Sequence, residues 1–130
     1  MSSRRKARVL LVEDDELIRE VYSIKLEMAG FEVATAENGL KAIEQVQEQT
    51  PDVVLLDMMM PVMGGLDFLR AVKLPQSYPE LDVIIFSNIS SPQQANEALA
   101  LGARQYLKKS DYTPDQLAQY LAKRNHHKVE

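Results

Sequence analysis

The sequence contains no cysteine, which removes several kinds of chemistry at once. Disulfide bonds, thiolate metal sites and cysteine nucleophiles are all excluded. Long apolar runs are lacking too: none approaches the roughly 18 residues of a membrane-spanning helix, and the N-terminus has no apolar core of a signal peptide. We therefore expect a cytoplasmic protein that does not bind membranes.

The chain also lacks an excess of positive charge. Its formal net charge is -4 over 130 residues, which argues against a direct nucleic-acid binder because binding to a phosphate backbone needs clustered positive charge. Four basic residues near the N-terminus are interpreted as a solvated tail: Arg4, Arg5, Lys6 and Arg8. The composition, 45% hydrophobic and 26% charged, predicts one ordinary globular domain over residues 1–130, with a core at about 7–123.

Short apolar segments alternate with helical patterns five times along the chain. The predicted strands cover residues 7–12, 31–35, 50–57, 82–86 and 105–108. Such alternation is typical of βαβ units, which build a parallel sheet with helices on both faces. The sequence therefore predicts an α/β fold.

The helices are predicted from apolar spacing and from capping residues. The first ends at Gly30 and has an apolar stripe at Leu17, Val21, Ile24 and Met28, with Ile18 and Tyr22 alongside. Two later helices begin with capping-box patterns, Ser91 with Gln94 and Thr113 with Gln116. The core positions predicted on the other helices are Leu40, Ile43, Val46, Leu66, Leu69, Val72, Leu117 and Leu121.

Four of the five predicted strands end in residues that carry chemistry. Glu13 and Asp14 follow the first strand, Asp57 ends the third, Ser87 follows the fourth and Lys109 the fifth. Ligands bind at the carboxyl ends of the strands in such sheets, so we expect these side chains to converge at one edge. Taken singly, each could instead be a helix cap or an ordinary surface residue.

Three converging carboxylates repel one another by ~1 kcal/mol per pair in water and ~4 kcal/mol near a protein surface, and a divalent cation would offset this. Carboxylate oxygens with no histidine or cysteine nearby favour Mg²⁺. A site with Mg²⁺, an ammonium group and a hydroxyl suits a transferring phosphoryl group. The acceptor of that group can be a carboxylate.

Four segments together resemble the receiver domains of two-component response regulators, of the single-domain, chemotaxis-regulator-like kind. They are LLVEDDELIRE, PDVVLLDMMMPVMGG, IIFSNIS and GARQYLKK, in the same order and at matching spacings. The resemblance implies a flavodoxin-like, doubly wound (βα)5 three-layer sandwich, with a five-stranded parallel sheet of order 2-1-3-4-5. It also implies a switch that catalyses only its own phosphorylation and dephosphorylation.

By this resemblance, Asp57 accepts a phosphoryl group from a sensor histidine kinase or a histidine phosphotransfer protein. Glu13, Asp14, Asp57 and the backbone carbonyl of Met59 would bind Mg²⁺. Lys109 and Ser87 would complete the catalytic set by contacting phosphate oxygens.

The resemblance also implies a switch made of Ser87 and Tyr106. On phosphorylation, Ser87 would bond a phosphate oxygen and draw its loop inward, while Tyr106 would turn from exposed to buried. An unknown downstream protein would bind the face around Tyr106 and the last two helices.

Several residues depart from the family pattern. Ser110 follows Lys109, where proline with a cis bond is common, so we expect a trans or more mobile loop. Asn88 replaces a small residue and could cover the site, and Gly64 replaces an aspartate and loosens its loop. As a hypothesis, Met59 and Asn88 restrict the attacking water and lengthen the phosphoryl lifetime.

Other interpretations stay open. The chain could be a binding module of the same fold that works without phosphorylation. A Mg²⁺-dependent phosphohydrolase of the haloacid-dehalogenase type is less favoured, because Met59 stands where the second aspartate would be, and a flavin-binding domain lacks its phosphate loop. The capped last helix favours a free-standing protein over a piece of a longer one, and His126 and His127 are interpreted as part of a polar tail that begins at Arg124.

Overall fold

The five predicted strands form one parallel sheet in the computed structural model, which describes residues 4–74, 76–88, 91–124 and 128–129. The strands are β2 (Arg8–Val12), β3 (Glu32–Ala36), β4 (Val53–Leu56), β5 (Asp82–Ser87) and β6 (Gln105–Lys108). Their order is β3-β2-β4-β5-β6, and each neighbouring pair is parallel. Counted along the chain, this is the expected order 2-1-3-4-5, so the predicted fold is confirmed.

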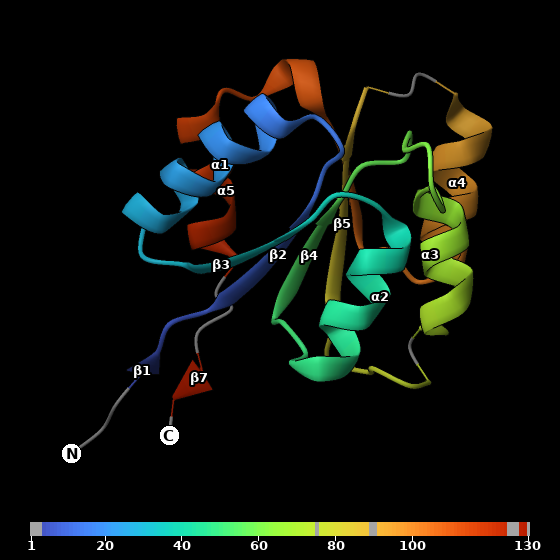
Figure 1. The fold of residues 1–130 in the computed structure, drawn as a ribbon, viewed down its shortest axis with the longest axis horizontal. Helices are drawn as coiled ribbons and strands as arrows, with labels where there is room; N and C mark the ends of the chain where they lie inside the picture. Colours follow the sequence, from blue (N-terminus) through green and yellow to red (C-terminus); the bar gives the residue numbers. More distant parts are fainter. Residues whose placement is uncertain (1–3, 75, 89–90, 125–127, 130) are drawn as a thin grey trace.

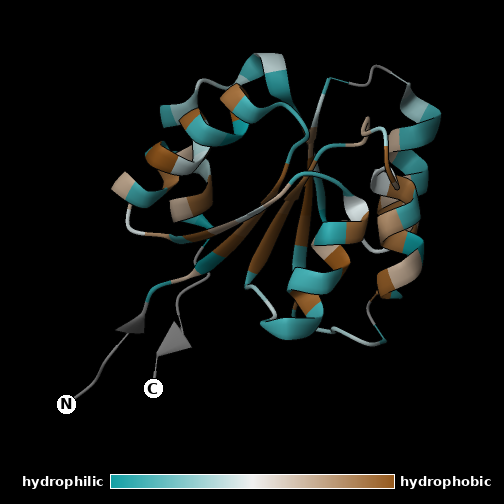
Figure 2. Ribbon diagram, in the orientation of Figure 1, coloured by the Kyte–Doolittle hydropathy of each residue, from teal (hydrophilic) through white to brown (hydrophobic). Residues whose placement is uncertain are grey.

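The sheet is the most apolar part of the molecule, and Figure 2 shows its central strands in brown. The side chains of β4 alternate between the two faces, as a strand requires. Val54 and Leu56 pack into the core on one face, and Val53 and Leu55 into the core on the other. All four are fully buried, which explains why this strand is a continuous apolar run.

Helices cover both faces of the sheet (Figure 1). On one face lie α1 (Glu16–Met28) and α5 (Pro114–Lys123), which contact each other. On the other face lie α2 (Gly39–Glu48), α3 (Gly65–Val72) and α4 (Pro92–Ala100). The result is the three-layer sandwich that the strand and helix pattern predicts.

The predicted helix ends are largely correct. Gly30 follows α1 with a φ of 100°, a left-handed conformation that glycine adopts without strain. Thr113 caps α5 and forms the full capping box with Gln116. Ser91 caps α4 by accepting from the Gln94 amide, and the return bond from the Gln94 side chain is not among the contacts of the described residues.

The predicted extent of α1 is confirmed, but its stripe faces solvent and not the core. Leu17 and Met28 are 70% and 72% exposed, and Val21 and Ile24 are exposed as well. Leu26 is fully buried, because it lies on the side of α1 that faces the sheet. Tyr22 packs against the same core, and both Ile18 and Tyr22 are half-buried.

The predicted core positions of α2 are correct only in part. Val46 is buried and Ile43 half-buried, but Leu40 is 49% exposed. The smaller residues Gly39 and Ala42 are buried in its place. The Gly39 amide donates to the Met63 carbonyl at 3.0 Å, so the start of the helix lies against the loop that follows β4.

The two ends of the chain lie side by side (Figure 1), where β1 (Arg4–Arg5) pairs antiparallel with β7 (Lys128–Val129). Arg124 does not begin a tail as expected, because its guanidinium binds Asp82 at the amino end of the sheet. His126 and His127 lie outside the described residues. No helix in the described part of the chain is both long and apolar enough to cross a bilayer.

Candidate functional site

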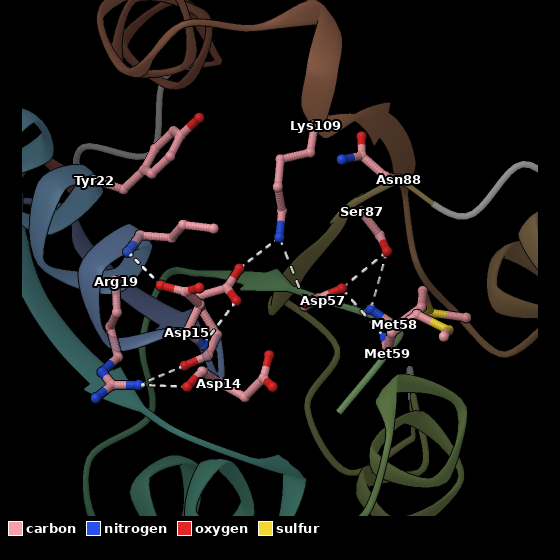
Figure 3. Close-up of polar contacts among 12 residues, drawn as sticks. Asp14, Asp15, Arg19, Tyr22, Asp57, Met58, Met59, Ser87, Asn88 and Lys109 are labelled. Carbon is pink, nitrogen blue, oxygen red and sulfur yellow. Dashed lines mark hydrogen bonds and ion pairs between the residues drawn. The ribbon is translucent and has the colours of Figure 1, made fainter. Parts of the chain in front are cut away.

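Four strands deliver polar side chains to one end of the sheet (Figure 3). Glu13 follows β2, Asp57 follows β4, Ser87 ends β5 and Lys109 follows β6. The parallel register places these ends together, because Val12 pairs with Leu56 and Ser87 pairs with Lys108. The predicted convergence is therefore what the structure has.

Three carboxylates gather here. Ligand oxygens of Glu13, Asp14 and Asp57 all lie within 4.8 Å of one another. Glu13 and Asp57 are 3% and 7% exposed, while Asp14 is exposed. Hard oxygen donors at this spacing, open on the Asp14 side, fit Mg²⁺, which retains several waters and takes few protein ligands.

The turn after β2 orients the acids. The Asp15 side chain caps α1 by accepting from the Ile18 amide at 3.0 Å. The Asp15 amide in turn donates to Glu13 Oε2 at 3.0 Å, which fixes the Glu13 carboxylate. Arg19 Nη1 donates to the Glu13 carbonyl at 2.8 Å, so the first turn of the helix holds this corner in place.

Lys109 is the cation of the site. Its Nζ donates to Glu13 Oε1 at 2.5 Å and to Asp57 Oδ2 at 3.4 Å. The same nitrogen lies 5.9 Å from the centre of the Phe86 ring. Lys109 begins the short 3₁₀ helix η1 (Lys109–Asp111), so a backbone turn sets the direction of its side chain.

Ser87 contacts Asp57 directly. Its hydroxyl donates to Asp57 Oδ1 at 2.9 Å, and the Met58 amide donates to Ser87 Oγ at 3.4 Å. The hydroxyl thus already contacts the unmodified carboxylate, and its bond to a phosphate oxygen with an inward shift of its loop stays a prediction. The Met59 amide also donates to Asp57 Oδ1, at 3.2 Å.

The charges at this end of the sheet do not balance. Burial raises the pKa of Glu13 above its usual 4.5, against the lowering effect of Lys109. Burial lowers the pKa of Lys109, but its hydrogen bond to Glu13 and the charge of Asp57 outweigh this and leave the pKa above 10.5. Lys109 is thus firmly charged, and its ammonium contacts two of the three acids, Glu13 and Asp57.

The other residues singled out by the sequence lie around this centre. Tyr106 is half-buried on β6 and packs against the core, and burial followed by the charge of Asp57 raises its pKa. The Met59 side chain is 66% exposed, and its carbonyl as a metal ligand stays a prediction. Gly64 caps α3 with an ordinary φ of -69°, whereas at Gly65 a Cβ would lie 3.0 Å from the Asp57 carbonyl.

Sequence reasoning missed one contact beside the site. The Ser110 amide donates to Asn88 Oδ1 at 2.8 Å, and this bond joins the ends of β5 and β6. The signal was present in the two departures from the family pattern, Asn88 and Ser110. Nothing in the sequence, however, indicated that they contact each other.

Comparisons with known proteins agree with this geometry. The family model for the response regulator receiver domain matches residues 9–122. The chain is 33% identical over 115 residues to a gliding motility regulatory protein of Myxococcus xanthus, covering 88% of this chain and 15% of that protein. It is 31% identical over 109 residues to the phosphate regulon transcriptional regulatory protein PhoB of Pseudomonas aeruginosa, covering 84% and 47%.

Solved structures give a closer match in length. The chemotaxis protein CheY4 of Vibrio cholerae is similar with a TM-score of 0.82 and 34% identity, and the match covers 92% of this chain and 98% of that one. The curated relatives are longer, since the chain spans less than half the length of the two named above.

Proposed function

The chain belongs to the receiver domains of two-component response regulators, and from this premise we propose that Asp57 accepts a phosphoryl group from a sensor histidine kinase or a histidine phosphotransfer protein. The observation that carries the proposal is the pair of donors on Asp57. Ser87 Oγ contacts one carboxylate oxygen and Lys109 Nζ the other, beside two further acids.

In the proposed reaction, an Asp57 oxygen attacks phosphorus and forms an O–P bond as the N–P bond to the donor histidine breaks. Lys109 leaves Glu13 to bind a phosphate oxygen, and the Ser87 hydroxyl donates to another. Both donors already contact Asp57 before the reaction, so a short movement lets them stabilise the charge that spreads over the phosphoryl oxygens. The site therefore promotes phosphorylation of its own residue and does not turn over external substrates.

Glu13, Asp14, Asp57 and the Met59 carbonyl would bind Mg²⁺. The ion, when bound, neutralises charge between the acids and the incoming phosphoryl group. Glu13 and Asp57 supply buried oxygens, and Asp14 supplies an exposed one that solvent reaches. The Lys109 ammonium contacts two of these acids, and Asp14 adds a third carboxylate beside them, which supports the assignment.

The proposed output is a change at Ser87 and Tyr106 that alters binding of a downstream protein at the face of β6, α4 and α5. A phosphoryl group adds roughly -1.5 to -2 charge and three acceptors at Asp57. Tyr106 is half-buried and close enough for the charge of Asp57 to affect its pKa, which suits it to respond. A cytoplasmic location and a single receiver domain over residues 1–130 complete the proposal.

Two alternatives are less well supported. A phosphohydrolase needs an acid and base two residues after the nucleophile, and Met59 offers none. A binding module that works without phosphate gives no reason for Lys109 to lie between two buried acids. The donors on Asp57 and the surplus of acids favour phosphoryl acceptance over both.

Intact mass after incubation with Mg²⁺ and acetyl phosphate tests the proposal. We expect a gain of one phosphoryl group per chain, absent for Asp57→Asn and absent when EDTA removes divalent cations. If acetyl phosphate fails, a phosphorylated histidine kinase serves as the second donor. A chain that gains no phosphoryl group from either donor contradicts the proposal.

A further inference from the structure

A hydrogen bond links the two residues that follow Ser87 and Lys109, the side-chain donors to Asp57. Asn88 directly follows Ser87, and Ser110 directly follows Lys109. The Ser110 amide donates to Asn88 Oδ1 at 2.8 Å. Figure 3 shows Asn88 beyond Ser87, on the side of the chain segment that carries Lys109 and not over Asp57.

The bond satisfies a backbone group that η1 leaves free. The first amides of a helix have no acceptor within the helix. Lys108, at the N-cap of η1, provides no side-chain hydrogen bond. The Asn88 side chain therefore acts as a cap supplied by the neighbouring strand.

The position of this cap matters for Lys109. The Lys109 backbone is held on one side by β6, whose Lys108 pairs with Ser87, and on the other by the Asn88 bond to Ser110. Its Nζ reaches Asp57 at 3.4 Å, a long contact that a small backbone shift would break. Side chains of catalytic sites depend on such support, since a displacement of about 1 Å can cost ~100-fold in rate.

We propose that Asn88 is a positioning residue. By accepting the Ser110 amide, it keeps the Lys109 ammonium and the Ser87 hydroxyl in contact with the two carboxylate oxygens of Asp57. The inference rests on the proposed function for its effect on rate. It assigns Asn88 a role different from covering the site, because its side-chain oxygen already accepts the Ser110 amide proton.

A double-mutant cycle tests the proposal. Asn88→Ala removes the acceptor, and Ser110→Pro removes the donor because proline has no amide hydrogen. Asn96→Ala deletes the same side chain from an exposed site on α4 and serves as the matched control. Each variant is first checked for a native thermal transition.

We expect Asn88→Ala to lower the rate of Asp57 phosphorylation by saturating acetyl phosphate and Mg²⁺ by roughly 3- to 10-fold, with little change in the half-saturating concentrations. In the Ser110→Pro background the same substitution should have no further effect. If Asn88 instead covers the site, Asn88→Ala raises the rate equally in both backgrounds. That result, or an equal loss in both, would overturn the proposal.

Nuclear magnetic resonance of the unphosphorylated protein gives a readout that does not depend on the reaction. In Asn88→Ala, exchange of the Ser110 amide should accelerate, and the Lys109 and Met58 amide signals should shift, with no such change in Asn96→Ala. If the parent protein is not phosphorylated at all, the proposed function fails and this measurement alone decides the positioning role. Unchanged Ser110 exchange would disprove it.

Discussion

The two ends of the sheet both bury carboxylates, but the cationic groups that contact those carboxylates differ. At the amino end, Asp82 is 4% exposed and receives a bidentate contact from Arg124, with Nε and Nη2 at 2.9 and 3.0 Å from its two oxygens. Asp52 there accepts from the Arg8 amide at 2.8 Å. At the carboxyl end, Glu13 and Asp57 share the ammonium of Lys109.

The difference separates stability from function. A guanidinium fork matches a carboxylate in charge and in geometry, so Arg124 offsets the buried charge of Asp82 at the amino end. Its hydrogen bond to Asp82 is the largest cause that raises the pKa of Arg124. The carboxyl end has more acids than cations, which costs stability and creates affinity for positive charge. Buried acids of similar exposure thus have opposite roles.

The largest effect should come from removing an acid at the carboxyl end. Asp14→Asn is expected to weaken Mg²⁺ binding by about 100-fold, since loss of even an outer-shell partner costs 10- to 100-fold. Asp52→Asn, the control at the other end, should leave the affinity unchanged. Calorimetric titration with MgCl₂ measures both. Equal weakening in the two variants would contradict the distinction between the ends.

The next effect concerns stability at the amino end. Arg124→Leu leaves Asp82 buried without its cation and should lower the free energy of unfolding by about 2 kcal/mol, with no change in Mg²⁺ affinity. Lys123→Leu, at the exposed neighbouring position, is the control. Urea denaturation of both, of Asp82→Asn and of Arg124→Leu combined with Asp82→Asn measures the coupling. Strictly additive losses would show that the pair contributes no specific interaction.

A smaller effect, of opposite sign, is expected at Glu13. Because its pKa is raised above 4.5, the folded protein holds this proton more tightly than the unfolded chain. The resulting stability is present below the unfolded pKa and is lost as pH rises through the folded pKa. In EDTA at pH 7, Glu13→Gln should therefore be more stable than the parent by ~1 kcal/mol, and the difference should vanish toward pH 4.

Urea denaturation across that pH range measures the Glu13 effect. A variant less stable than the parent at pH 7 would mean that the bond between Glu13 and Lys109 outweighs the cost of burial. In that case the carboxyl end would resemble the amino end more than its charge balance indicates.

The smallest effect is expected at the exposed rim of the site. Met59→Asn should shorten the lifetime of the phosphorylated protein a few-fold, because an amide can orient a water that the thioether side chain excludes. Val62→Asn makes the same kind of change at another exposed position of the loop and should have no effect. Loss of radiolabel or mass over time gives the lifetime. If Met59→Asn loses its phosphoryl group no faster than the parent, the hypothesis is abandoned.

The sequence predicted the carboxyl end of the sheet much better than the amino end. Parallel strands bring consecutive strand ends together, so Glu13, Asp57, Ser87 and Lys109 could be grouped without knowing any distance. Arg124 lies 42 residues from Asp82, directly after the last helix, and no local pattern links them. The bond from Ser110 to Asn88 was missed for the same reason.

Helix faces were also predicted unevenly. On α3, Leu69 and Val72 are buried as expected, while Leu66 is half-buried. On α1, apolar residues occupy both faces, and spacing alone cannot say which one meets the sheet. The face of α1 that meets the sheet is the one with Tyr22, which packs edge-on against Phe86. This contact depends on a strand more than sixty residues later in the chain.

The wide spacing of the site along the chain also bears on synthesis. The bond from Lys109 to Glu13 joins residues 96 positions apart. It depends on β2 and β6, which are the first and last strands of this sheet in chain order. A nascent chain that has left the ribosome only as far as the start of α3 already carries Asp57 but neither of its side-chain donors. The complete constellation therefore exists only in fully folded molecules, so the proposed phosphorylation would by itself distinguish finished protein from partial folds.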